Sequence, residues 1–238
     1  MSGAGPQLNP ALEPDKIAAA YARDRRVHIP SVLTAESARR VHSCLGEETQ
    51  FSLVTRNGDG YVRLRPDVVL SPEQQSDAMH KAYDRARNGF NYFYDNHPMS
   101  NDGEPYPDPS HYLAAVTGFL NSAPFLDFVR RITGSSEIRF AEAQATCYRP
   151  GHFLNLHDDG HGVHGRIAAY VLNMTPRWRD GWGGALLFFD SAGRMCEGWL
   201  PAFNALNIFA VPQEHQVSFV SPFAGAHRFS ITGWFRSR

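Results

Sequence analysis

Three histidines and two aspartates lie within the stretch FLNLHDDGHGVHGR, which spans residues 153–166. In a β-strand, residues i and i+2 point to the same face, so a strand through HFLNLHDD would bring His157 and Asp159 together and turn Asp158 outward. One imidazole and one carboxylate at this spacing supply two of the three ligands of the 2-His-1-carboxylate arrangement that is typical of non-haem Fe(II). Because the H-x-D triplet is common by chance, a third ligand must come from elsewhere in the chain.

His215 is the best candidate for that third ligand. It begins the strand HQVSFV after the turn VPQ. The several strands before it are enough for the chain of a barrel to come back to the open end that carries His157 and Asp159. His161 and His164 follow the H-x-D pair in a glycine-rich loop and are expected to face solvent. His152 would point to the opposite face of the strand. The H-x-D pair and His215 are therefore the predicted metal ligands.

A buried cation is predicted near the C-terminus, in the segment AHRFSITGWF. Strand alternation places Arg228, Ser230 and Thr232 on one face, which lines the interior if the sheet closes into a jelly roll. An arginine inside a barrel is costly unless it meets an anion, and its guanidinium fork suits a carboxylate. Two interpretations stay open at this point: a ligand carboxylate, or an internal salt bridge to an acid such as Glu142.

The elements that must position these residues fall into two halves. From residue 137 onward, short β-rich runs are separated by Gly, Pro and Asp turns, and roughly eight strands at this spacing indicate an antiparallel sandwich or barrel. The first half mixes a hairpin around RNGDG, the aromatic strand FNYFYD and a long loop at 96–110 with several helices. Helices are expected at 15–24, 35–45 (after Thr34 as N-cap), 72–88 (after Ser71), 110–121 and 124–133.

We therefore predict an α+β fold, a double-stranded β-helix (jelly roll) with N-terminal helices packed on one face. The helical support is expected at 15–136 and the jelly-roll core at 137–238, together forming a single domain at 15–238. Residues 1–14 are rich in Gly and Pro and are expected to be poorly ordered.

The amino-acid composition limits the classes of binding partner that are expected. The chain has 238 residues, of which 42% are apolar, and its net charge is −1 from 23 basic and 24 acidic residues. This balance predicts neither a nucleic-acid nor a membrane partner. No secretory signal pattern and no apolar run long enough for a membrane span are found. The three cysteines lack C-x-x-C spacing, which favours free thiols and a cytoplasmic location.

The ordered set H-x-D, His215 and Arg228 resembles the Fe(II)/2-oxoglutarate-dependent oxygenases, specifically their prolyl 4-hydroxylase-like branch. The resemblance covers about 138–236. It includes CYRPG before the metal pair, R-x-x-A-x-x-L in RIAAYVLN, GG-x-L in WRDGWGGALLFF, PAFNALNIFAVP with HQV, and RFSITGWF. The last segments are most similar to the ribosomal-protein prolyl hydroxylases. Those carry a second, degenerate barrel, which this chain, ending at Arg238, is not expected to contain.

The resemblance implies a role for ten residues. The metal ligands for Fe(II) would be His157, Asp159 and His215; the contacts to 2-oxoglutarate would be Arg228, Tyr148, Asn173, Leu186 and Val217; the substrate contacts would be Arg166 and Trp234. Many relatives carry a tyrosine at the position of Asn173. Asparagine is shorter and would reach the distal carboxylate only through a water or a shifted cosubstrate.

The implied reaction uses O2 and 2-oxoglutarate, releases succinate and CO2, and hydroxylates a C–H bond, with ascorbate as a possible reductant. A prolyl residue of a protein is the expected substrate, and a free amino acid or small metabolite is the alternative. Since residue 159 is a carboxylate, hydroxylation is expected in place of halogenation. Two readings of other classes stay open: a zinc hydrolase that uses the same ligands, and a non-catalytic jelly-roll binding module.

Overall fold

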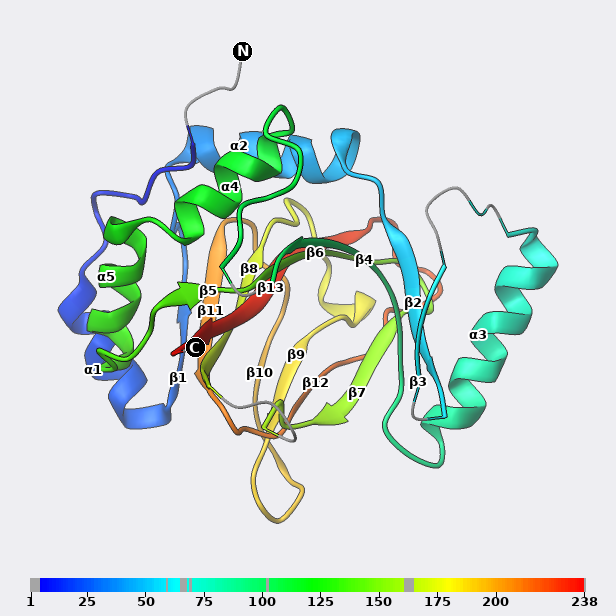
Figure 1. Ribbon diagram of the computed structural model, residues 1–238. Coiled ribbons are helices and arrows are strands. Elements are labelled where there is room, and N and C mark those ends of the chain that lie inside the picture. The colour runs from blue at the N-terminus through cyan, green and yellow to red at the C-terminus, as the bar shows by residue number, and fades with distance from the viewer. Residues whose placement is uncertain are drawn as a thin grey trace.

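An antiparallel sheet, curled until its two end strands face each other, forms the centre of the computed structural model (Figure 1). The structure describes residues 5–58, 60–64, 68, 70–101, 103–160 and 165–237. Along the sheet the strands follow the order β1 (Arg26–Ile29), β11 (Ala205–Ala210), β8 (Arg166–Asn173), β13 (Arg228–Arg236), β6 (Ala143–Tyr148), β4 (Tyr92–Ser100), β7 (Phe153–His157), β12 (His215–Val217), β9 (Leu186–Phe189) and β10 (Met195–Trp199). The predicted α+β class and jelly roll are confirmed.

Strands of the first half of the chain are part of this sheet. β4 pairs with both β6 and β7, and β1 pairs with β11. The hairpin of β2 (Ser52–Asn57) and β3 (Gly60–Arg63) joins the outer edge of β4, while β5 (Phe140–Ala141) pairs with β13. The sheet therefore extends beyond the jelly-roll core expected at 137–238. β4 also continues to Ser100, into the segment expected to begin the loop at 96–110.

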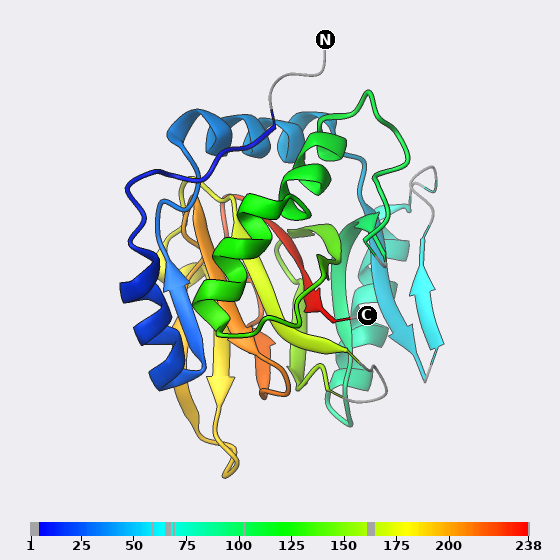
Figure 2. The same ribbon diagram turned by 60° about the vertical axis from the view of Figure 1, so that its left-hand side comes forward.

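The five α-helices of the described residues cover two different sides of the sheet. They are α1 (Pro14–Asp24), α2 (Ala35–Ser43), α3 (Pro72–Ala86), α4 (Tyr112–Leu120) and α5 (Ala123–Thr133). α1, α2, α4 and α5 share one apolar core with β8, β11 and β13, and Figure 2 shows α4 and α5 crossing in front of these strands. α3 departs from the expectation of one common face. It packs through Ala82 against Phe93 of β4 and Phe153 of β7, at the right in Figure 1, whereas α1 and α5 lie at the left.

Local sequence signals set the helix ends. The Thr34 hydroxyl accepts a hydrogen bond from the backbone N–H of Ser37, as expected for the N-cap of α2. Ser71 and Gln74 form a reciprocal capping box at the start of α3. This helix ends at Ala86, two residues before its expected end at 88. Within the described residues, no individual helix combines the length and apolar character of a membrane span, although α4 and α5, bent by 45° at their junction, meet these criteria as a pair.

The N-terminal segment differs from the expectation of poor order over 1–14. Residues 1–4 lie outside the described residues, but the next ones pair with the loop before α2. The backbone N–H of Asn9 donates to Val32 at 2.9 Å, and the carbonyl of Gln7 accepts from Thr34 at 3.0 Å. Leu8 and Leu12 pack against the main core. These two apolar side chains explain why a segment rich in Gly and Pro is held against the domain.

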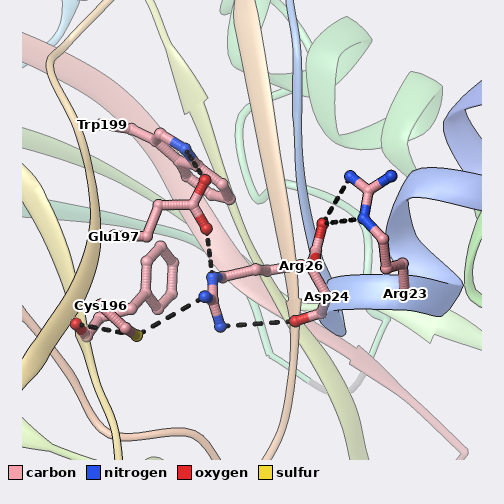
Figure 3. A network of polar contacts seen from close by, with 7 residues as sticks. Arg23, Asp24, Arg26, Cys196, Glu197 and Trp199 are labelled. Carbon is pink, nitrogen blue, oxygen red and sulfur yellow. Dashed lines mark hydrogen bonds and ion pairs between the residues drawn. The ribbon is translucent and has the colours of Figure 1, made fainter.

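A polar seam joins the two end strands of the sheet, β1 and β10 (Figure 3). The guanidinium of Arg26 pairs with the carboxylate of Glu197, which also accepts a hydrogen bond from the indole N–H of Trp199 at 2.9 Å. Arg26 lies over the ring of Phe188, with 5.2 Å from Cζ to the ring centroid. Because β1 and β10 share no backbone ladder among the described residues, these side chains hold the curled sheet closed at this edge.

We expect the Glu197→Gln variant to lose about 1 kcal/mol of unfolding free energy, because the largely buried Arg26 guanidinium would lose its charged partner. Glu13→Gln is the matched control, since Glu13 pairs with Lys16 where both side chains are exposed. Urea denaturation compares the two variants. Equal stability of Glu197→Gln and the wild type would show that the seam does not depend on this ion pair.

Candidate active site

His157, Asp159 and His215 converge in one group. His157 at the end of β7 lies opposite His215 at the start of β12. Nε2 of His157 is 3.5 Å from one carboxylate oxygen of Asp159, and Nε2 of His215 is 3.5 Å from the other. One ligand atom from each residue lies within 4.8 Å of the other two. This is the donor set, two imidazoles and one carboxylate, that suits a non-haem iron with open coordination positions.

Asp159 reaches the group through a turn and not through strand alternation. β7 ends at His157, so the expected strand through Asp159 is wrong, although the expected pair is brought together. Asp159 has a φ of 60°, in the left-handed region, which aspartate adopts more readily than most residues. The side chain of Asp158 accepts a hydrogen bond from the backbone N–H of Gly160 at 3.0 Å and so supports the turn.

Both histidines are held in the tautomer that a metal needs. Nδ1 of His157 lies 2.9 Å from the carbonyl of Asn155, and Nδ1 of His215 lies 2.8 Å from the carbonyl of Gln213. A carbonyl can only accept, so Nδ1 carries the proton and Nε2 keeps its lone pair. Burial, together with the neighbouring His157, lowers the pKa of His215 to about 4. The ring is therefore neutral at pH 7.

Arg228 is a buried cation with no carboxylate partner among the described residues. Its side chain is 1% exposed, and its Nε has no hydrogen-bond partner. The ring of Tyr148 lies 5.0 Å from Cζ, and burial lowers the pKa of the guanidinium. The alternative of a salt bridge to Glu142 is wrong, because Glu142 pairs with Arg236. An unpaired buried charge is expensive, so the site is suited to an anionic ligand.

The metal group and Arg228 line the same cavity, which has a volume of about 540 Å³. Five further residues assigned by resemblance also lie on its wall: Tyr148, Leu186, Val217, Arg166 and Trp234. Asn173 does not. Its side-chain amide is directed at the backbone carbonyls of Val171 and Ala205, at 3.5 and 3.4 Å. The short side chain stays within the sheet, so the structure does not bring Asn173 to the cavity.

Arg166 and Trp234 form one unit beside the metal group. The guanidinium of Arg166 stacks over the indole, with 3.6 Å between Cζ and the ring centroid, in a close cation–π contact. Its Nη1 donates a hydrogen bond to the carbonyl of Asp159 at 3.1 Å. The unit is thus fixed to the turn that carries the carboxylate ligand.

Sequence reasoning missed the wall that β4 and the hairpin before it supply. Phe90, Tyr92 and Tyr94 line the cavity, as does Tyr61 of β3. The ring of Phe90 lies 5.2 Å from that of His157, between centroids. The alternation of aromatic residues in FNYFYD was the available signal. It pointed to this face only once β4 was known to sit inside the barrel sheet.

The remaining candidate ligands do not join the metal group. His152 lies just before β7, buried against Phe93, and does not line the cavity. His161 and His164 lie outside the described residues. A second group, Cys44, Glu48 and His111, is explained by structural contacts: Glu48 pairs with Arg40, and the two nitrogens of His111 contact the backbone of Glu48 and Leu113.

Comparison with known proteins agrees with this geometry. Residues 143–236 match the family model of the 2OG-Fe(II) oxygenase superfamily. The chain carries a 2OG-Fe(II) oxygenase domain. The matched range contains the three residues of the metal group and Arg228, so the donor set and the unpaired guanidinium fit the iron and the 2-oxoglutarate that this family uses. The protein is a 2-oxoglutarate-dependent dioxygenase. A search of curated proteins found no match.

Solved structures share the fold at low identity. A prolyl-4-hydroxylase from Pseudomonas putida is 17% identical, covers 95% of this chain and 100% of its own, and gives a TM-score of 0.60. An oxidoreductase of the 2OG-Fe(II) oxygenase family from Burkholderia pseudomallei is 14% identical over 98% of this chain and 94% of its own, with a TM-score of 0.65. A prolyl hydroxylase from Trichoplax adhaerens, in complex with a peptide fragment of hypoxia inducible factor, is 17% identical over 94% and 89%, with a TM-score of 0.60. The 2OG-Fe(II) oxygenase domain thus has a prolyl-hydroxylase-like fold.

We expect Asp159→Ala to weaken Mn(II) binding by at least about tenfold, because it removes one of the three converging ligands. Asp158→Asn is the matched control: it changes the adjacent carboxylate, which supports the turn and is not one of the three converging ligands. Isothermal titration calorimetry measures both affinities. Loss of Mn(II) binding in Asp158→Asn, with normal binding in Asp159→Ala, would mean that the other aspartate is the ligand.

Proposed function

We propose that this dioxygenase is a prolyl hydroxylase that acts on a proline residue of a protein. The observation that carries the proposal is one cavity that holds a 2-His-1-carboxylate group and a buried, unpaired guanidinium. The prolyl-4-hydroxylase from Pseudomonas putida and the peptide-bound hydroxylase from Trichoplax adhaerens support the choice of substrate. We also propose that 15–238 forms one oxygenase domain, because β1 and β4 are built into the sheet of the second half.

In this proposal the metal group and Arg228 each bind a different part of the reacting complex. His157, Asp159 and His215 hold Fe(II), and Arg228 pairs with a carboxylate of 2-oxoglutarate. Iron, when bound with 2-oxoglutarate, would let O2 act as the oxidant: 2-oxoglutarate would lose CO2 and take one oxygen atom as succinate, and the other oxygen atom would hydroxylate a C–H bond.

The walls of the cavity keep water from the reacting atoms. Leu186 and Val217, which we assign to the cosubstrate pocket, are buried and line the cavity. Phe209 adds an aromatic ring 4.6 Å from the ring of His215, between centroids. An apolar lining also removes side chains that a strong oxidant would attack near the metal.

The mouth of the cavity favours a peptide over a small metabolite. Tyr61 and Phe90 line it and are 58% and 40% exposed, so an aromatic surface continues outward from the metal group. Aromatic surfaces of this kind suit the apolar ring of proline in an extended chain. Arg166 stacked on Trp234 would orient such a chain beside the metal. A free amino acid or small metabolite as substrate is the alternative outcome of the substrate experiment below.

The zinc hydrolase and the inert binding module explain less of the site. Both leave the guanidinium of Arg228 buried without an anion among the described residues. We expect anaerobic addition of Fe(II) and 2-oxoglutarate to produce the weak visible charge-transfer band of a chelated keto acid, and aerobic addition to release succinate. Absorbance spectroscopy of the purified protein tests this. If the folded protein binds Fe(II) and no band appears, the oxygenase assignment fails.

Arg228→Met should raise the KM for 2-oxoglutarate by at least about tenfold, because a hydrogen bond to a charged group contributes about 1.5–3 kcal/mol. The KM from succinate release measures the effect. Arg194→Met, a change in the exposed pair with Asp190, is the control and should leave the KM unchanged. An unchanged KM in Arg228→Met would move the carboxylate site elsewhere.

The substrate itself is tested by incubating a proteome with the protein, Fe(II) and 2-oxoglutarate, and searching by mass spectrometry for added oxygen. We expect the modification on proline residues. Modification of other residues only, or of free metabolites only, would contradict the prolyl assignment while leaving the oxygenase intact.

A further inference from the structure

A row of three side chains crosses the interior of the sheet beside the metal group. Tyr94 of β4 stacks on Tyr148 of β6, with 4.9 Å between ring centroids and 7° between ring planes. Tyr148 lies opposite Arg228 of β13, and its ring is 5.0 Å from the guanidinium carbon. All three line the cavity. Tyr94 therefore lies next to the site that we assign to 2-oxoglutarate, although no motif in the sequence marked it.

The neighbouring hydroxyls and amides are committed to the sheet. The hydroxyls of Thr146 and Ser230 are hydrogen bonded to each other at 2.7 Å, and that of Thr146 also lies 3.3 Å from the carbonyl of Ser230. The side-chain amide of Asn173 is directed at backbone carbonyls. The hydroxyls of the two tyrosines stacked beside Arg228 are therefore candidate donors to an anion there.

The side chain of Gln144 is a polar neighbour of the Tyr94 hydroxyl. Its interaction with the hydroxyl lowers the pKa of Tyr94, against the larger effect of burial. The oxygen of the Gln144 side chain accepts from the amide of Asn96 at 3.0 Å. Burial raises the pKa of Tyr94 well above its ordinary value, so the hydroxyl keeps its proton at neutral pH. Among the described residues, no protein group accepts that proton.

We propose that Tyr94 donates a hydrogen bond to bound 2-oxoglutarate, and that Gln144, supported by Asn96, is the positioning residue for its hydroxyl. The inference rests on the proposed function of this cavity. A neutral donor next to an unpaired guanidinium is suited to a carboxylate, because hydrogen bonds to an ionised acceptor are stronger than those between neutral groups. Tyr94 reaches the cavity from β4, whereas Asn173 on β8 does not line it.

The test uses the full chain with Mn(II) in place of iron, so that binding is measured without turnover. We expect Tyr94→Phe to raise the Kd for 2-oxoglutarate by about tenfold, measured by isothermal titration calorimetry. Tyr112→Phe is the matched control. It removes the hydroxyl of another buried tyrosine, which lies on α4 and does not line the cavity, and should leave the Kd unchanged. An unchanged Kd in Tyr94→Phe overturns the inference.

A double-mutant cycle separates positioning from a general structural effect. Gln144→Leu should raise the Kd less than Tyr94→Phe does, and it should add nothing in the Tyr94→Phe background, because it acts through that hydroxyl. Additive effects would contradict the positioning role. The Tm of each variant is measured alongside, and Gln144→Met, which keeps the length of the side chain, replaces Gln144→Leu if the latter does not fold.

The outcomes distinguish this inference from the proposed function. If the folded wild type binds Mn(II) but not 2-oxoglutarate, the proposed function fails, and the inference fails with it. If the wild type binds 2-oxoglutarate and Tyr94→Phe binds it equally well, only the inference fails.

Discussion

The unpaired charge of Arg228 is the constraint on which the rest of the site depends. The guanidinium is 1% exposed and has no carboxylate partner among the described residues. Leaving a buried charge without its partner typically costs about 3–5 kcal/mol. The fold must supply this energy from its apolar core, and a bound dicarboxylate returns part of it. Ligand binding and stability are therefore linked, since a ligand that binds only the folded state stabilises it by mass action.

The curled sheet brings this charge and the metal group together. Arg228 is carried by β13, which is paired on both sides, with β6 and β8. The metal-binding histidines lie on β7 and β12, in a different part of the strand order, and β4 connects the two parts by pairing with both β6 and β7. The helices on one side and α3 on the other cover the outer faces of these strands. The distance between the guanidinium and the imidazoles is thus set by β4, the strand that also supplies Tyr94.

Residue type and spacing predicted His157, Asp159 and His215 as metal ligands. For Arg228 the residues alone left a ligand carboxylate and a salt bridge to Glu142 open, and only the resemblance to the oxygenases favoured the ligand. The geometry of Asp159 was not predictable, because a left-handed turn in a non-glycine residue leaves no clear mark in the sequence. The contributions of Tyr94 and Gln144 depend on which strands are neighbours. Pairing between β4 and β6 joins segments separated by two helices, and no local pattern specifies it.

The most direct test of the account is a crystal structure of the protein with Mn(II) and 2-oxoglutarate. The account predicts one metal ion bound to Nε2 of His157, Nε2 of His215 and the carboxylate of Asp159, with a carboxylate of 2-oxoglutarate paired with Arg228 in the same cavity. A metal ion bound elsewhere, or an Arg228 guanidinium left unpaired while 2-oxoglutarate lies outside the cavity, would contradict it.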